Sequence, residues 1–433
     1  MARNKGKKKM GLTTMIFISL ILGAVVGAII NTWFMDINVV KNVIVEGVFY
    51  VIGQGFVSLM KMLVVPLVFF SIICGAAAIG DTKTLGSVGV RTIIFYLFTT
   101  MMAVAIALCM ARLINPGIGL DMSAVENVST TVSSSSTKTD MSIVDTILNI
   151  IPTNPVAALA NGEMLQIIVF ALLVGVILAK LKEKAQLVMN FCTQCNDIMM
   201  EMTMMIMKVA PIGVFCLIGR TFSELGFSAM VPMFKYMITV VAGLGVQCFV
   251  VYMILLKVFT GLNPFKFAKK FFPVQAFAFS TATSNATIPL NIDTLADKIG
   301  VSRKISSFTI PLGATINMDG TSIMQGVAVV FVAQAFGIHL SPADYMTVIV
   351  TATLASIGTA GVPSVGLITL AMVFDSVGLP VSGIGLIMGI DRILDMLRTA
   401  VNITGDAVCT TIVAKQNNAL DVEVFNKVDE LSN

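Results

Sequence analysis

Charge is the scarcest property of this sequence. Only 12% of its 433 residues are charged, whereas 56% are hydrophobic, and the mean hydropathy is +0.92. A soluble domain has about 25% charged residues, so a fold of this composition has too little polar surface to face water. The composition excludes a cytosolic globular enzyme, a disordered chain and a nucleic-acid-binding protein. It predicts an all-α polytopic membrane protein.

Residues that build catalytic and metal centres are also scarce. His339 is the single histidine, which argues against a histidine metal site or a Ser-His-Asp triad. The seven cysteines are scattered through apolar runs and form no disulfide framework. Cys192 and Cys195 make a lone CxxC without a second pair. The sequence therefore predicts a protein that is not an enzyme, with no cofactor.

Long apolar runs make up most of the chain. A spanning helix needs about 20 apolar residues. Eight segments meet this length, and those that exceed 30 residues must be tilted, kinked or broken. The candidate spans are 11–32, 43–78, 88–113, 142–179, 192–220, 229–258, 303–335 and 382–414.

Two further apolar segments, 264–296 and 342–378, are interrupted near their middle by small and polar residues. Irregular backbone survives at membrane depth only inside protein or beside a watery cavity. The pattern predicts two re-entrant helical hairpins. Together with the seventh and eighth spans they form hairpin-plus-helix twice, entering from opposite sides, which indicates inverted repeats.

Lysine and arginine are concentrated in alternate loops, which predicts the orientation. Both termini should be cytoplasmic, with the first hairpin entering from the cytoplasm and the second from outside. The predicted parts are a basic cytoplasmic N-terminus (1–10), a six-span part (11–258) with a polar external loop (115–141), a core of hairpins and spans seven and eight (259–416), and a cytoplasmic tail (417–433).

The last span carries its charges on one face. At 100° per residue its five polar residues fall within an arc of about 80°. Three acids and one base leave a negative surplus, and buried charges need partners. Bound cations would supply them; the alternative is a set of structural ion pairs that hold the bundle together. The five residues are Asp391, Asp395, Arg398, Asn402 and Asp406.

The seventh span contains Asn-Met-Asp-Gly-Thr at 317–321 inside an otherwise apolar run. Gly320 weakens a helix, and Asn317 and Asp319 favour local hydrogen bonds over helical ones. A break there would free carbonyl oxygens and create a hard-oxygen site suited to an alkali cation. A simple kink is the alternative. Paired broken segments of this kind are typical of a transporter site at the membrane midplane.

These motifs resemble the dicarboxylate/amino acid:cation symporter family, which has the glutamate-transporter fold. The resemblance covers almost the whole chain. It rests on 317–321, on Ser-Ile-Gly-Thr-Ala-Gly-Val-Pro at 356–363, on the run 395–406, on Lys-Met-Leu-Val-Val-Pro at 61–66 and on Ile-Pro-Thr-Asn-Pro at 151–155. It implies eight spans, two re-entrant hairpins, a mobile transport domain, and a homotrimer held by a scaffold domain in the lipid of the plasma membrane.

The resemblance also implies roles for individual residues. Arg398 would bind a side-chain carboxylate of the substrate, and Asp395 its ammonium group. The other implied substrate contacts are Thr399, Asn402, Thr321 and Ser284, with the hairpin residues Ala360, Gly361, Val362 and Pro363. The implied sodium sites are Gly313, Asn317, Asn402 and Asp406; Thr315, Met318, Ser356, Ile357 and Thr359; and Tyr96, Thr99, Thr100, Asn317 and Asp319.

The function expected from these features is secondary active import of aspartate or glutamate, coupled to two or three Na⁺ by an elevator-type mechanism. The open alternatives are coupling to H⁺ instead of Na⁺, and transport of C4-dicarboxylates or cystine. A channel would need a continuous polar pore, yet only the last third of the chain is polar at depth. A membrane-embedded enzyme would need a paired nucleophile and base, which the sequence does not offer.

Overall fold

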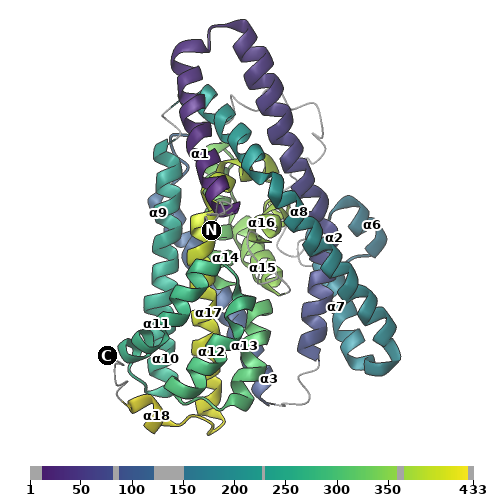
Figure 1. Ribbon diagram of the computed structural model, residues 1–433. Coiled ribbons are helices and arrows are strands. Elements are labelled where there is room, and N and C mark those ends of the chain that lie inside the picture. Colours follow the sequence, from purple (N-terminus) through teal and green to yellow (C-terminus); the bar gives the residue numbers. More distant parts are fainter. Residues whose placement is uncertain (1–11, 81–86, 121–150, 227–229, 358–364, 428–433) are drawn as a thin grey trace, which may run out of the picture.

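A computed structural model describes residues 12–80, 87–120, 151–226, 230–357 and 365–427 (Figure 1). Within these ranges the protein is helical and forms no strand; an isolated bridge joins Val301 to Leu420. The prediction of an all-α protein is confirmed for this part of the chain.

The helices of the N-terminal half are α1 (Leu12–Ile29), α2 (Tyr50–Gly80), α3 (Ser87–Ile114), α6 (Pro155–Asn161), α7 (Met164–Leu181), α8 (Gln186–Leu225), α9 (Met230–Val246) and α10 (Tyr252–Thr260). Those of the C-terminal half are α11 (Pro264–Thr281), α12 (Ser284–Thr294), α13 (Arg303–Ile316), α14 (Asp319–Ala335), α15 (Pro342–Ser356), α16 (Val365–Ser376), α17 (Ile384–Gln416) and α18 (Val422–Asn426). Short π and 3-10 segments join or extend them: η1 (Ile30–Phe34), η2 (Val40–Phe49), η4 (Lys182–Ala185), η6 (Gln247–Val251), η7 (Leu295–Ile299) and η8 (Val381–Gly383).

Several of these helices are long and apolar enough to cross a bilayer. In the described ranges three meet this test, and a fourth span results if a pair bent by 56° counts as one. The predicted number of eight spans remains a prediction, since part of the fourth lies in 121–150, outside the described residues. The spans are Val88–Ile114, Met230–Thr260 and Arg303–Ala335, and the bent pair is Gln166–Ile206 with Ala210–Glu224.

The first predicted hairpin corresponds to two helices joined by a tight turn. Pro264 starts α11, and the Asn263 side chain caps it by accepting from two backbone amides. The chain reverses at Ala282, which has a left-handed backbone (φ +51°), and α12 then packs against α11. The second predicted hairpin corresponds to α15 and α16, whose connection, 358–364, lies outside the described residues.

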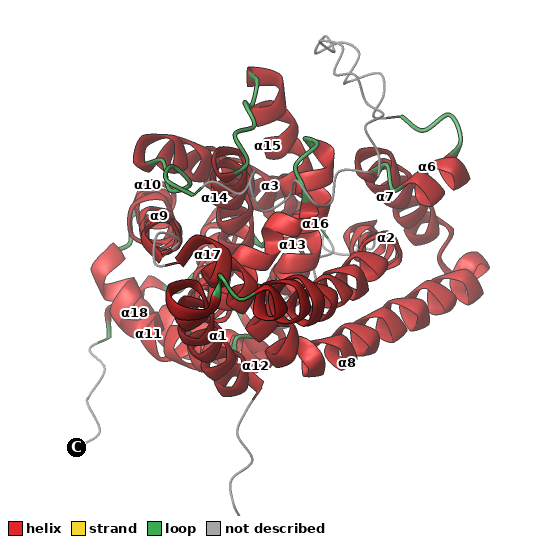
Figure 2. Ribbon diagram, turned by 90° about the horizontal axis from the view of Figure 1, so that it is seen from above, coloured by secondary structure: helices red, strands yellow, loops and turns green. Residues whose placement is uncertain are grey.

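Helix α17 lies among the helices of the C-terminal half. It packs against α9, α10, α11, α13 and α14, whereas α2 packs along α7 and α8, and α1 along α8. In both views α6 and α7 lie on the side of the molecule away from α9 and α10 (Figures 1 and 2). Because α17 packs against these five helices, protein surrounds the polar face of the last predicted span.

Glycines let α1 and α8 approach closely, as small residues do between membrane helices. A Cβ atom added at Gly27 would lie 2.7 Å from the Cβ of Phe222 and 3.0 Å from the amide nitrogen of Ser223. An added Cβ at Gly55, in α2, would meet nothing within 4 Å. An added methyl group would therefore collide with neighbouring atoms at Gly27 but not at Gly55.

We expect Gly27→Ala to destabilise the protein by about 1–3 kcal/mol, the usual cost of overpacking. Gly55→Ala is the matched control, and it should be neutral or slightly stabilising because alanine is the better helix former. The apparent melting temperature of the purified variants in detergent checks this. Equal melting temperatures for the two variants would contradict the close packing of α1 on α8.

Candidate functional site

The seventh predicted span is broken at its centre. Helix α13 ends at Ile316, Asn317 has an extended backbone (φ −88°, ψ 92°), and α14 begins at Asp319. Backbone hydrogen bonds flank the break: the Asn317 amide donates to Gly313 O in the last turn of α13 (2.8 Å), and the Ser322 amide donates to Met318 O in the first turn of α14 (2.9 Å). Because this span is buried inside the protein, the irregular backbone is shielded from lipid, as expected.

Arg398 of α17 lies at the centre of a buried ion cluster. Its side chain is 1% exposed and donates from Nη1 to Asp391 Oδ1 (2.7 Å) and from Nη2 to Asp395 Oδ1 (2.8 Å). Its Nε atom is buried and has no hydrogen-bond partner among the described residues. Two carboxylates on one guanidinium carry a formal surplus of one negative charge.

Asp319 is the centre of a second buried polar group. Its carboxylate is fully buried and accepts hydrogen bonds from Thr100 Oγ1 (2.6 Å), Gln247 Nε2 (2.9 Å) and Tyr252 OH (2.7 Å). The predicted proximity of Thr100 and Asp319 is thus present in the structure. Gln247 and Tyr252, on η6 and α10, were not predicted; the signal was a glutamine in the apolar span Met230–Thr260.

Asp406 and two asparagines connect the break to α17. Asn317 Nδ2 donates to Asp406 Oδ1 (2.9 Å) and to the carbonyl oxygen of Asn402 (3.0 Å). The Asn402 side chain accepts from the Gly320 amide (2.7 Å) and donates to Met318 Sδ (3.3 Å). The Oδ1 atom of Asn317 is buried and accepts no hydrogen bond from the described residues. The structure therefore brings together most of the predicted oxygen ligands of this break.

Two glycines make room for these groups. A Cβ atom at Gly313 would collide with Asp406 Oδ1 and lie 2.6 Å from Tyr96 OH. A Cβ atom at Gly366, in α16, would lie 2.9 Å from the methyl group of Thr321 and 3.5 Å from Arg398 Nη2. Helix α16, of the second predicted hairpin, thus lies directly against Arg398 and Thr321.

The remaining predicted residues make backbone contacts within their own helices. Hydroxyl groups donate from Thr399 to Asp395 O, from Thr99 to Tyr96 O, from Thr315 to Leu312 O and from Ser356 to Thr353 O, while the Ser284 carbonyl accepts from Thr287 and the Ile357 amide donates to Leu354 O. Tyr96 OH reaches Thr309 O at 3.2 Å. Thr359, Ala360, Gly361, Val362 and Pro363 lie outside the described residues.

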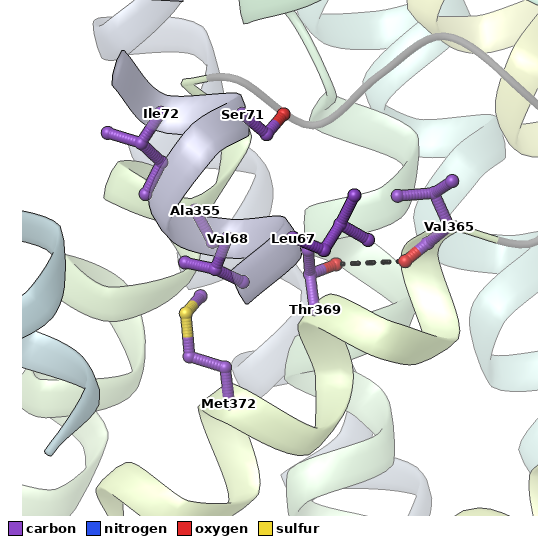
Figure 3. Close-up of a pocket in the computed structure, with 8 residues that line it drawn as sticks. All are labelled: Leu67, Val68, Ser71, Ile72, Ala355, Val365, Thr369 and Met372. Atoms are coloured by element: carbon purple, nitrogen blue, oxygen red, sulfur yellow. Dashed lines mark hydrogen bonds between the residues drawn. The ribbon is translucent and has the colours of Figure 1, made fainter. Parts of the chain in front are cut away.

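A small cavity lies between α2, α15 and α16 (Figure 3). Its wall is mostly apolar; Thr369, which donates to backbone carbonyls of its own helix, lies on it opposite Leu67 and Val68. Thr369 also accepts a hydrogen bond from Gln325 Nε2 of α14 (2.9 Å). Helix α16 therefore packs against α2 and is also tied to α14 by a side-chain hydrogen bond.

A match to the sodium:dicarboxylate symporter family covers residues 12–416. The chain belongs to this family. It is a membrane transporter and not an enzyme. Symporters of this family use a cation as the coupling ion and need no cofactor. The predicted resemblance is confirmed.

Relatives of this symporter include proteins from bacteria and animals. It is 37% identical to a proton/sodium-glutamate symport protein of Bacillus caldotenax over 94% of this chain and 95% of the relative. It is 34% identical to a proton/glutamate-aspartate symporter of Escherichia coli (95% and 94%). It is 32% identical to an excitatory amino acid transporter of Caenorhabditis elegans (87% and 82%).

The hydrogen bond from Tyr252 to Asp319 should contribute to the stability of this symporter. Hydrogen bonds to charged groups contribute about 1.5–3 kcal/mol, so Tyr252→Phe should lower the apparent melting temperature clearly. Tyr345→Phe is the matched control, since it also loses a phenol oxygen, but one that accepts from Arg112 at an exposed position. If both variants have the melting temperature of the unaltered protein, the hydrogen bond from Tyr252 to Asp319 does not contribute to stability.

Proposed function

We propose that this symporter imports acidic amino acids, L-aspartate or L-glutamate, across the plasma membrane together with two or three Na⁺ ions. The proposal includes a homotrimer, cytoplasmic termini, and an elevator-type movement of the core 259–416 against the six-span part. The observation that carries it is the buried guanidinium of Arg398, held 2.8 Å from Asp395 beside a broken span. The names of the three relatives support the substrate class.

The substrate is selected by two opposite charges on one helix. The Arg398 fork recognises a carboxylate in two parallel hydrogen bonds. In the proposed mechanism the substrate side-chain carboxylate replaces Asp395 on Arg398, and Asp395 then pairs with the substrate ammonium group. A C4-dicarboxylate has no ammonium group and would leave Asp395 without this partner, so an amino acid fits the pair better. Thr321, which lies beside Gly366 next to Arg398, is placed to contact the same ligand.

The cations are assigned to the oxygen-rich groups around the break. One group contains Asp406 and Asn317, whose side chains are hydrogen-bonded, with the Gly313 carbonyl that accepts from the Asn317 amide; the other contains Asp319 and Thr100. Oxygen donors of this kind suit a hard alkali cation. Buried carboxylates also accept protons, which keeps H⁺ as the alternative coupling ion, and the relatives' names include both ions.

Energetics favour more than one cation per substrate. An amino acid of net charge −1 is opposed by an inside-negative potential, and each elementary charge moved is worth about 2.3 kcal/mol per 100 mV. A tenfold gradient of a coupled ion adds about 1.4 kcal/mol. At 100 mV one Na⁺ would therefore supply about 1.4 kcal/mol in total, two about 5.1 and three about 8.8. Two carboxylate-centred cation groups match this requirement.

Arg398→Ala should abolish uptake of radiolabelled aspartate into proteoliposomes and weaken aspartate binding more than tenfold. The physical reason is that binding weakens by several orders of magnitude when a buried polar or charged group of the site or the ligand is left without its partner. Arg303→Ala is the matched control, because Arg303 is 57% exposed and pairs only with the exposed Asp293 and Asp297 among the described residues. An Arg398→Ala protein that binds aspartate within tenfold of the unaltered protein would refute the substrate assignment.

Asp406→Asn and Asp319→Asn should each raise the sodium concentration that gives half-maximal uptake, because each removes a negatively charged cation ligand. Asp293→Asn, at an exposed position, is the control. Uptake should follow an imposed sodium gradient at equal pH on both sides, and a proton gradient without sodium should not drive it. Unchanged sodium curves in both variants, with uptake driven by protons alone, would replace Na⁺ with H⁺ as the coupling ion.

A further inference from the structure

A long apolar groove runs along the outer side of α11, away from the Arg398 cluster. It consists of two hollows with volumes of about 400 and 360 Å³, which both contact Phe249 of η6. The first lies between α9, η6, α11 and α17, and the second between η6, α10 and the start of α11. Phe249 and Phe272 on its walls are 68% and 64% exposed. We call this surface the α10–α11 groove.

A glycine on the wall of the first hollow leaves space where a side chain would project. An added Cβ atom at Gly245 would meet nothing within 4 Å, so this wall position opens onto empty space. The polar residue Gln275 on the wall donates its amide to Thr404 (2.8 Å) and is thereby satisfied within the protein. The first hollow therefore presents mostly hydrocarbon surface to a ligand.

One end of the groove carries positive charge. Lys257 is the single charged residue among those described as lining the second hollow. Its ammonium group donates to the Gly261 carbonyl at 3.3 Å, and an ammonium group has three donors, so donors remain for a ligand. Lys269 follows the groove residue Ala268 on α11 and is exposed.

The length of the groove matches one leaflet of a bilayer. Gly245 and Lys257 are twelve residues apart, which corresponds to about 18 Å along a helix. Half of the hydrocarbon core is about 15 Å thick. Lys257 lies three residues before the end of the span Met230–Thr260, so its charge reaches the headgroup level when Gly245 lies near the midplane.

We propose that the α10–α11 groove binds one anionic phospholipid, with an acyl chain along α11 toward Gly245 and the phosphate group at Lys257. An apolar slot of leaflet length with a cation at its headgroup end complements such a lipid in shape and in charge. Each lysine near an anionic surface favours acidic over neutral lipid by about fivefold. The proposal rests on membership of a membrane transporter family and is independent of the substrate assignment.

A single tryptophan in the groove can report its occupant. Trp33 is the only tryptophan of the sequence, so Trp33→Phe with Phe249→Trp leaves one fluorophore on the shared wall. The protein is reconstituted in phosphatidylcholine bilayers that contain either brominated phosphatidylglycerol or brominated phosphatidylcholine. Half-maximal quenching should need about fivefold less brominated phosphatidylglycerol. Gly245→Leu should fill the groove and reduce this preference.

Lys257→Gln should remove the preference for phosphatidylglycerol, whereas Lys184→Gln, at an exposed lysine of η4, should retain it. Native mass spectrometry of the chain with its natural Trp33 and Phe249 provides a second measurement, in which phosphatidylglycerol should stay bound to Lys184→Gln and be lost from Lys257→Gln. Equal quenching by the two lipids, or a preference that survives Lys257→Gln, would overturn the proposal. Tryptophan shielded from both lipids would show that a protein segment or a second copy covers the groove, and would also overturn it.

Discussion

The buried charge of Arg398 constrains the packing of everything around it. Removing an ion from water costs several kcal/mol even after relaxation, and the pairing repays this only with good geometry and hydrogen bonds. Asp391 and Asp395 provide that geometry at 2.7 and 2.8 Å. Two close approaches complete it: an added Cβ at Gly320 would lie 2.7 Å from Arg398 O, and one at Gly366 would lie 3.5 Å from Nη2. Helix α14 can therefore approach α17 this closely only because Gly320 lacks a side chain, and α16 approaches Thr321 of α14, 2.9 Å from an added Cβ at Gly366, for the same reason.

The residues proposed to bind the substrate and those proposed to bind a cation are connected through Asn402 of α17, which would give a physical basis for coupling. Asn402 lies one turn after Arg398 and binds the Gly320 amide, while Asn317 bridges the Asn402 carbonyl and Asp406. A cation that draws the Asn317 or Asp406 oxygens toward itself would shift the same backbone that positions Arg398. Coupling between two ligands is reciprocal, so a bound substrate would in turn favour the cation-binding arrangement.

Much of this site could be predicted from local patterns. The spacing of Asp395, Arg398, Asn402 and Asp406 requires one helical face whatever surrounds it, and Gly320 within 317–321 marks the break. The sequence contains weaker signals for side chains that reach the site from distant helices. Gln247 and Tyr252 meet Asp319 only because α9 and α10 pack against α14 and α17, and no periodicity within their own span encodes that packing. The number of spans and the division into two moving parts depend in the same way on long-range contacts, and they remain predictions.

Helix α17 has two faces that fix its rotation. At 100° per residue, Ala400 falls about 160° from both Arg398 and Asn402, and Leu397 falls about 100° from Arg398. Both residues line the apolar groove, together with Val401 at its edge. A rotation of the helix by itself would carry a guanidinium and carboxylates toward hydrocarbon, where charges are expensive. The charged face must therefore stay away from lipid as the protein changes state. A movement that carries α17 together with the helices around it meets this condition, whereas a rotation of α17 by itself does not, and this constraint favours the proposed elevator movement over a rocking of α17 within its bundle.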